Sequence, residues 1–304
     1  MKCINCENDF REDASPCFNI RQTVEKSYTG PAMTLIIITL FAIAATSLTA
    51  IVYDIAELAG GSFRLEVIMQ LVRNALHCAF SLVSAIASVK ALALPAAKNI
   101  NAFYAQRPFM TVRRVLLITM MIIGTVWMAS FAVILLVVGT GASARGLYKD
   151  AHWIGVNVGT WQYVLLVIGI YVVAITAWII SFIMIAGTYG RITKYYHMIT
   201  AAYTDNKHDT RVKPPFIRCF VIGSLLIVLG LAGLSFCFSQ TVRYYAMNIF
   251  NGIDFSVADN VLRSLLFQLI ALMLMGVHLI LNGVIIHKYE VRLNDGVLAA
   301  TRLN

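Results

Sequence analysis

Five stretches of this sequence contain no charged side chain, and they constrain the fold more than any other feature. Each is longer than the roughly 20 residues with which an α-helix crosses about 30 Å of hydrocarbon. Charged residues make up 13% of the chain, whereas soluble domains carry about 25%. The sequence therefore predicts membrane-spanning helices. The stretches without Asp, Glu, Lys or Arg are 27–53, 115–144, 151–190, 219–242 and 264–287.

A sixth apolar segment, Ala75–Leu94, is interrupted near its end by Lys90. A lysine near a helix end can extend its amine to the lipid headgroups, so this segment also qualifies as a span. The predicted fold is an all-α polytopic bundle of six transmembrane helices. These form three consecutive hairpins, for which an internal repeat and chance are both open explanations. The predicted spans are 33–53, 75–94, 115–140, 161–189, 216–238 and 265–286, within a transmembrane domain of residues 33–290 flanked by tails 1–32 and 291–304.

The distribution of Lys and Arg among the connections predicts the orientation of the chain. The N-terminal tail, 95–114, 190–215 and the residues after the sixth span, 287–304, carry 16 of these residues, whereas the three other connections carry 6. The positive-inside rule places the richer set in the cytosol, so both termini are expected there. The net charge of +9 is then explained by topology and by contacts with anionic lipid, and nucleic acid is not an expected partner.

The N-terminal tail contains a cysteine motif, formed by Cys3, Cys6 and Cys17. It resembles the small zinc ribbon that precedes the spans of many bacterial membrane proteins, and this resemblance favours a bacterial cytoplasmic membrane. In that family the second knuckle is again Cys-x2-Cys, whereas Ile20 stands at the fourth position here. Because a structural zinc binds four N or S ligands, the motif is either a metal-free remnant or a site completed by another group. Zinc is the one cofactor that the sequence leaves open.

Two predicted spans carry polar residues on one helical face, and such residues are costly in a membrane. One interpretation is a shared path for a solute, with a histidine as proton acceptor. The other is hydrogen bonding and close packing between helices. No acidic residue lies inside a predicted span, and Asp54 and Glu57, just after the first span, are expected to face water; this favours packing. The residues are His77, Ser81, Ser84 and Ser88 in the second span and Gln268, His278 and Asn282 in the sixth.

No catalytic or nucleotide-binding motif occurs in the sequence, so an enzyme is not expected. The favoured interpretation is a non-catalytic accessory or assembly subunit that binds the lipid bilayer and either another membrane protein or a second copy of itself. The first alternative is a channel or transporter with a polar path along the second and sixth spans. The second is a zinc- or redox-responsive regulator that uses the N-terminal cysteines.

Overall fold

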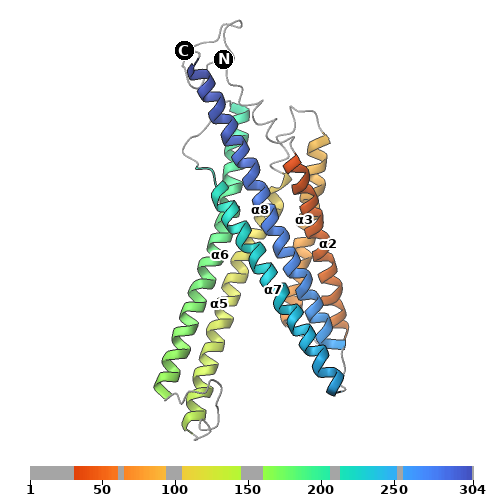
Figure 1. Cartoon of the computed structure of the whole chain (residues 1–304), viewed down its shortest axis with the longest axis vertical. Helices are drawn as coiled ribbons and strands as arrows, with labels where there is room; N and C mark the ends of the chain where they lie inside the picture. The colour runs from red at the N-terminus through yellow and green to blue at the C-terminus, as the bar shows by residue number, and fades with distance from the viewer. Residues whose placement is uncertain are drawn as a thin grey trace. The chain divides into compact units, whose positions relative to one another are not determined.

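The computed structural model describes residues 31–60, 65–93, 105–144, 160–205, 213–251 and 256–302. Over these residues the chain is all-helical (Figure 1). The six helices are α2 (Pro31–Ala59), α3 (Leu65–Ala93), α5 (Arg107–Ala144), α6 (Thr160–Asp205), α7 (Phe216–Asn251) and α8 (Ser256–Arg302). Each is long and apolar enough to cross a membrane. The prediction of six apolar helices is therefore confirmed for the described part of the chain.

The helices extend beyond the predicted spans at several ends. Helix α3 begins at Leu65, ten residues before the predicted start at Ala75. Helix α5 begins at Arg107, eight residues before the predicted start at Val115. Both predicted starts were set by charged residues, and a helix can accommodate charged residues that lie at a membrane surface or are buried in the protein.

Proline and glycine mark some of the helix ends. Pro31 is the first residue of α2, a position where the missing N–H has no intrahelical partner to lose. Before α7, the Pro215 carbonyl accepts a hydrogen bond from the Cys219 N–H at 3.0 Å. Gly60 follows α2 and donates its N–H to the Ala56 carbonyl at 3.0 Å. These residues set where the chain leaves or enters the apolar segments.

The helices belong to two compact units. Unit 1 contains the described residues up to Arg113 and from Thr188 onward, and unit 2 contains Arg114–Gly187. In unit 1, α8 packs against both α2 and α7, and α2 packs against α3 (Figure 1). The face that α2 turns inward carries Ile36, Leu40 and Ile43, all fully buried. Their spacing of three and four residues is that of one helical face.

Helices α7 and α8 approach closely through glycine. A Cβ atom placed on Gly276 would lie 2.5 Å from the Gly223 carbonyl oxygen, and one placed on Gly223 would lie 2.7 Å from the Gly276 carbonyl oxygen. The backbones therefore meet where neither residue has a side chain. Small residues at such crossings are the usual means by which membrane helices pack, since lipid supplies no hydrophobic force between them.

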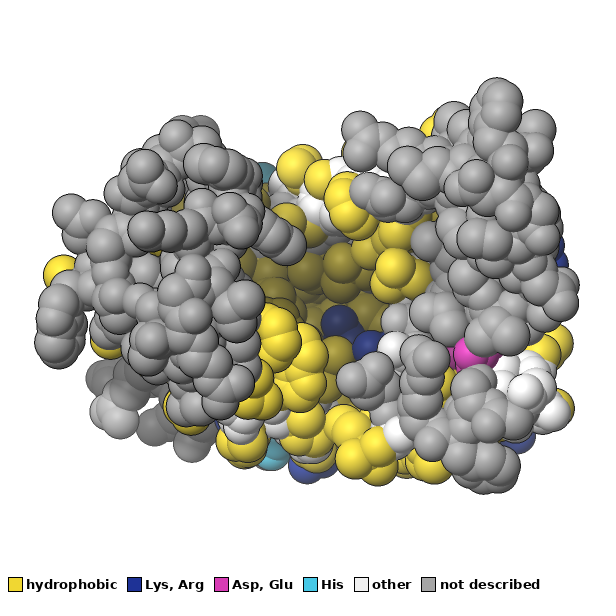
Figure 2. Space-filling view, turned by 90° about the horizontal axis from the view of Figure 1, so that it is seen from below, with side chains coloured by type: hydrophobic (Ala, Val, Ile, Leu, Met, Phe, Trp, Pro, Cys, Tyr) yellow, Lys and Arg dark blue, Asp and Glu magenta, His cyan; other side chains and the backbone are white. Residues whose placement is uncertain are grey.

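Unit 2 is a pair of antiparallel helical segments from α5 and α6. Trp178 packs over Gly124, where an added Cβ atom would lie 2.6 Å from the Trp178 ring, and the indole N–H donates to the Met121 carbonyl at 3.3 Å. Most other side chains of this unit are apolar and exposed, for example Trp127 and Val173. Hydrophobic side chains also dominate the described surface seen in Figure 2. A surface of this kind suits a hydrocarbon environment.

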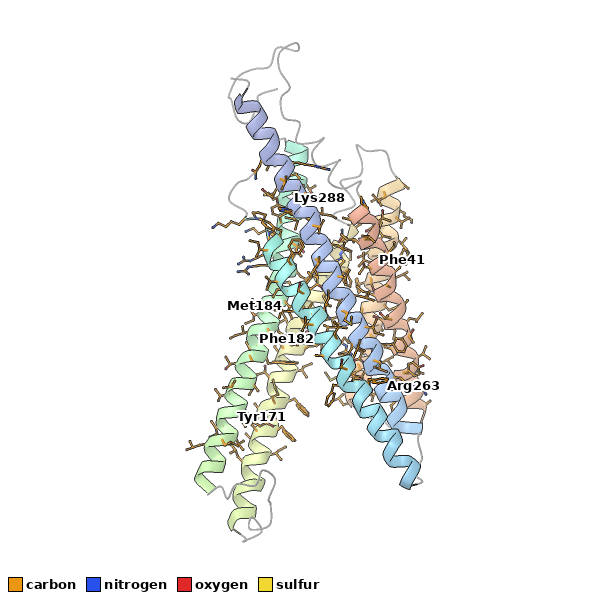
Figure 3. The ribbon with its side chains drawn as sticks, in the orientation of Figure 1. Phe41, Tyr171, Phe182, Met184, Arg263 and Lys288 are labelled. Atoms are coloured by element: carbon orange, nitrogen blue, oxygen red, sulfur yellow. The ribbon has the colours of Figure 1, made fainter. Side chains whose placement is uncertain are left out.

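Charged residues flank the apolar segment of α8. Arg263 lies near one end of this helix and Lys288 lies well toward the other (Figure 3). Residues 264–287 between them carry no Asp, Glu, Lys or Arg. The segment is long enough to cross the hydrocarbon core with a charged residue at each boundary.

Candidate functional site

Polar side chains, most of them buried, form three clusters in unit 1. We name them the Asp54 cluster, the Arg113 cluster and the His278 cluster. The Asp54 cluster contains Asp54, Gln70, Asn74, Ser264 and Gln268; the Arg113 cluster contains Arg73, His77, Arg113 and Tyr189; the His278 cluster contains Gln106, Tyr196, His278 and Asn282.

The Asp54 cluster connects α2, α3 and α8. Asp54 Oδ2 accepts a hydrogen bond from Asn74 Nδ2 at 2.7 Å, and Asp54 Oδ1 accepts one from Ser264 Oγ at 2.6 Å. Gln268 Nε2 donates both to Ser264 Oγ at 3.0 Å and to Gln70 Oε1 at 3.2 Å. A buried carboxylate held by donors from two other helices fixes the packing of all three.

The expectation that Asp54 and Glu57 face water is wrong. Asp54 is 2% exposed and Glu57 is 3% exposed, and both lie inside helix α2. They continue the buried face of that helix, which runs through Ser47 and Ala50 with spacings of three and four residues. The helix does not stop at the first charge, so the same face carries both carboxyl groups into the protein interior.

The Arg113 cluster brings positive charge into the protein interior. Arg113 Nη1 lies 2.9 Å from His77 Nε2, and both side chains are buried. Because a guanidinium group only donates, His77 Nε2 must accept this hydrogen bond and its proton is assigned to Nδ1. Arg73, one helical turn before His77 on α3, interacts electrostatically with both Arg113 and Asp54. Tyr189 of α6 interacts electrostatically with Arg113.

The His278 cluster connects α8 to α6 and to the residue preceding α5. His278 Nε2 lies 3.2 Å from Gln106 Oε1 and 3.3 Å from Asn282 Nδ2. Asn282 Oδ1 accepts a hydrogen bond from the Tyr196 hydroxyl group. The Phe109 ring packs edge-on against the His278 ring, with 5.1 Å between centroids. All of these side chains are buried.

The clusters extend across most of the thickness of a membrane. Ser264 and Asn282, the outermost members on α8, are 18 residues apart, which corresponds to about 27 Å at about 1.5 Å per residue. The hydrocarbon core of a bilayer is about 30 Å thick. Polar groups are therefore distributed along nearly the whole apolar length of unit 1.

The serines of α3 have local hydrogen-bond partners. Ser88 Oγ donates to the Ser84 carbonyl at 2.7 Å, and Ser81 Oγ donates to the His77 carbonyl. Ser84 Oγ accepts from the Phe109 N–H at 3.1 Å, which joins α3 to α5. These serines are fully buried. The serine hydroxyl groups therefore form hydrogen bonds with backbone groups, as Ser and Thr commonly do within helices.

The polar residues predicted from the sequence are distributed over different clusters. His278 and Asn282 contact each other, as their spacing predicts, whereas Gln268 belongs to the Asp54 cluster. His77 pairs with Arg113 and does not share a partner with His278. The polar residues of the second and sixth spans thus lie in the same unit, but most of their hydrogen-bond partners are residues that the sequence did not indicate.

The N-terminal motif of Cys3, Cys6 and Cys17 lies outside the described residues. Among the described residues, no group of three or more His, Cys, Asp or Glu side chains could hold a metal ion. Cys78 and Cys219 are free thiols, and the side chains of Cys219 and Cys237 are buried, as is common for cysteines that pack in protein interiors.

Most residues of the three clusters were missed by the sequence analysis, among them Arg113, Gln106 and Tyr196. Arg113 and Gln106 lie in 95–114 and Tyr196 lies in 190–215, and both segments were assigned to connections between spans. For Arg113, its position directly before the apolar segment that starts at Val115 could have indicated that it belongs to the same helix. Gln106 and Tyr196 give no comparable signal, because their roles depend on contacts with α8 that are distant in sequence.

No family model matches the chain, and neither a curated protein nor a solved structure gives a significant match. The function must therefore be argued from the geometry of unit 1.

Proposed function

We propose that this protein is an integral membrane transport protein that moves a small polar solute or ion through unit 1, along the three buried clusters. The observation that carries this proposal is the burial of Asp54, His77, Arg113 and His278 in helices of membrane-spanning length. Ionisable groups at membrane depth are rare because they are costly, and they commonly mark solute or proton pathways.

The accessory-subunit interpretation depended on the absence of acidic residues from the spans. Asp54 and Glu57 are buried in α2. The absence of acidic residues can therefore no longer be used to favour an accessory subunit over a transporter. Packing alone would be achieved at lower cost by apolar residues, since buried ion pairs are often replaced without loss of stability. The clusters are thus better explained as a pathway whose polar groups contact the transported species.

The membrane setting is part of this proposal. The exposed aliphatic side chains of unit 2 and the charge-free segment of α8 support insertion into a bilayer. The Lys and Arg distribution favours cytosolic termini, and the resemblance of the N-terminal motif to a zinc ribbon favours a bacterial cytoplasmic membrane. A zinc- or redox-dependent regulation through Cys3, Cys6 and Cys17 remains a separate prediction.

Reconstitution into vesicles tests the proposed function. Vesicles containing the purified full chain are exposed to gradients of potassium chloride, potassium acetate, potassium phosphate, urea and glycerol, and solute entry is followed by light scattering. The chain is expected to accelerate entry of at least one of these solutes over protein-free vesicles. A double variant, His278→Leu with Asn282→Leu, should abolish that acceleration because it removes the polar groups of the His278 cluster.

Asn294→Leu is the matched control, since Asn294 is exposed on the same helix. Its flux should equal that of the unmodified chain. If no solute of the panel enters faster than in protein-free vesicles, or if the double variant transports as well as the control, the proposed pathway is wrong.

A further inference from the structure

Two histidines are buried in unit 1, His77 on α3 and His278 on α8. His77 is 4% exposed and His278 is 0% exposed, so neither ring is in free contact with bulk solvent. Imidazole changes its charge near neutral pH, and a histidine on a polar pathway is therefore a natural candidate for a proton carrier. To act as a carrier, each ring must accept a second proton on its unprotonated nitrogen.

Gln106 fixes the tautomer of His278. Gln106 Nε2 donates to the Met33 sulfur at 3.6 Å, and Gln106 Oε1 lies 3.2 Å from His278 Nε2. Because an amide oxygen only accepts, the ring proton of His278 is assigned to Nε2. The side-chain amide of Asn282 donates to the His278 backbone carbonyl at 2.8 Å. Nδ1 is therefore the unprotonated nitrogen of the His278 ring.

A second proton on His278 would have no acceptor. Nδ1 is buried and has no hydrogen-bond partner among the described residues. Protonation would convert this atom from an unsatisfied acceptor into an unsatisfied donor of a charged ring, and an unmade hydrogen bond costs more for a charged group than for a neutral one. The ring would also bring an uncompensated charge into the protein interior. The neutral imidazole is thus strongly favoured.

His77 is constrained in a different way, by Arg113. His77 Nε2 accepts a hydrogen bond from Arg113 Nη1 at 2.9 Å, so Nε2 is the unprotonated nitrogen and a second proton would have to bind there. Two N–H groups would then face each other. A cationic ring would also be repelled by Arg113 and by Arg73, both of which act on it electrostatically. Protonation of His77 therefore requires the loss of its contact with Arg113.

Titratable side chains from the neighbouring helices do not remove these constraints. Tyrosine and cysteine are mainly neutral near pH 7, so those of α6 and α7 supply little negative charge. Two carboxyl groups of α2 are also buried, but a proton on His77 Nε2 displaces the Arg113 guanidinium group whatever charge they carry. These groups are Tyr196 of α6, which bonds to Asn282, Cys219 of α7, which interacts with Tyr196, Tyr189 of α6, which bonds to Arg113, and Asp54 and Glu57 of α2.

From these contacts we propose that the pathway is not coupled to protons through its histidines. His77 and His278 stay neutral while a solute passes, His77 as an acceptor for Arg113 and His278 as a donor to Gln106. A proton gradient then supplies no driving force through either ring. This inference rests on the proposed function, because it describes how the same pathway works, and it replaces the interpretation in which a histidine accepts a proton.

Nitrogen NMR of the full chain in detergent, labelled with isotopic histidine, tests the neutral state without any requirement for transport. Spectra are recorded from about pH 5.5 to about pH 8, the range in which free imidazole, with a pKa of about 6.5, changes its charge. Both buried rings should keep one protonated and one unprotonated nitrogen throughout, with the proton of His278 on Nε2. Free histidine added to the sample is the reference that titrates.

The resonances of the two rings are identified by their loss in His77→Gln and His278→Gln. The chain contains six histidines. If one of these variants does not fold, the remaining ring is identified by elimination, with single variants of the other four. A second protonation of either buried ring within the pH range would overturn the inference.

The flux assay gives a second test, with equal pH on both sides of the vesicle membrane. The acceleration of urea, glycerol or potassium chloride entry should change by less than about twofold over this range, whereas a step that needs a protonated imidazole would change by more than about tenfold. An inward proton gradient should not accumulate any of these solutes. His287→Gln is the matched control, since His287 is exposed on α8. A larger pH dependence that disappears in His77→Gln or His278→Gln, but not in the control, would contradict neutral histidines.

The two tests separate this inference from the proposed function. A chain whose buried histidines stay neutral but which transports no solute would keep the neutral histidines and reject the pathway. A chain that transports a solute with a pH dependence carried by His77 or His278 would keep the pathway and reject the neutral histidines.

Discussion

Asp54 on α2 and Ser264 on α8 are joined by a hydrogen bond of 2.6 Å although they are 210 positions apart in the chain. The same carboxylate accepts from Asn74 on α3 at 2.7 Å. One buried side chain therefore connects three helices of unit 1. We therefore expect the packing of α2 against α3 and α8 to depend strongly on Asp54.

Replacement of Asp54 by Ala should destabilise the protein strongly. The donors of Asn74 and Ser264 would both remain buried without an acceptor, at a cost of about 1–3 kcal/mol each. Denaturant titration in detergent micelles, followed by circular dichroism, measures the loss. Thr49→Ala is the matched control on the same helix, because the Thr49 hydroxyl group donates only to the Ala45 carbonyl of its own helix. Equal stability of the two variants would contradict the role assigned to Asp54.

Gly276→Ala should weaken the packing of α7 against α8. The added Cβ atom would meet the Gly223 carbonyl oxygen at 2.5 Å and Ile227 Cγ1 at 2.9 Å, and the backbone oxygen can move only if the helices separate. Overpacking of this kind costs about 1–3 kcal/mol. Gly169→Ala is the control, since nothing lies within 4 Å of its added Cβ atom. It should be neutral or stabilising, by up to about 1 kcal/mol, through helix propensity.

The helices of this protein were predictable from sequence because the signal for them is local. Runs without charge identify apolar helices from composition alone, and they need no knowledge of neighbouring segments. The clusters of unit 1 depend on contacts between distant segments, such as Gln106 with His278 and Arg113 with His77. No single segment contains that information.

The burial of Asp54 could have been predicted from local sequence, although its contacts with distant helices could not. A charged residue at the end of an apolar run was interpreted as the limit of a span and therefore as exposed. The spacing of Ile43, Ser47, Ala50 and Asp54 places all four on one helical face, and this periodicity would have predicted burial. The prediction of exposure was based on the charge of Asp54, whereas the position of Asp54 on the buried face of α2 predicts its burial correctly.

The contact between Tyr196 and Asn282 should contribute little to stability. The Tyr196 hydroxyl group donates to Asn282 Oδ1, and hydrogen bonds between membrane helices average about 0.6 kcal/mol. A double-mutant cycle of Tyr196→Phe and Asn282→Leu, measured by denaturant titration, should give a coupling energy of that size. A coupling several times larger would assign this pair a principal role in holding α6 to α8.

Unit 2 provides a direct test of membrane insertion. Trp127 is 59% exposed, and in a bilayer its ring would contact acyl chains. Trp178 packs over Gly124 and donates its indole N–H to the Met121 carbonyl, so a larger part of its ring contacts protein. In vesicles made with brominated lipid, a variant that keeps Trp127 as its single tryptophan should lose more fluorescence than one that keeps Trp178. Bromine quenches only on close contact, so the difference reports lipid exposure directly. If neither tryptophan is quenched by brominated lipid, unit 2 does not lie in the hydrocarbon, and its exposed aliphatic side chains must instead be covered by protein.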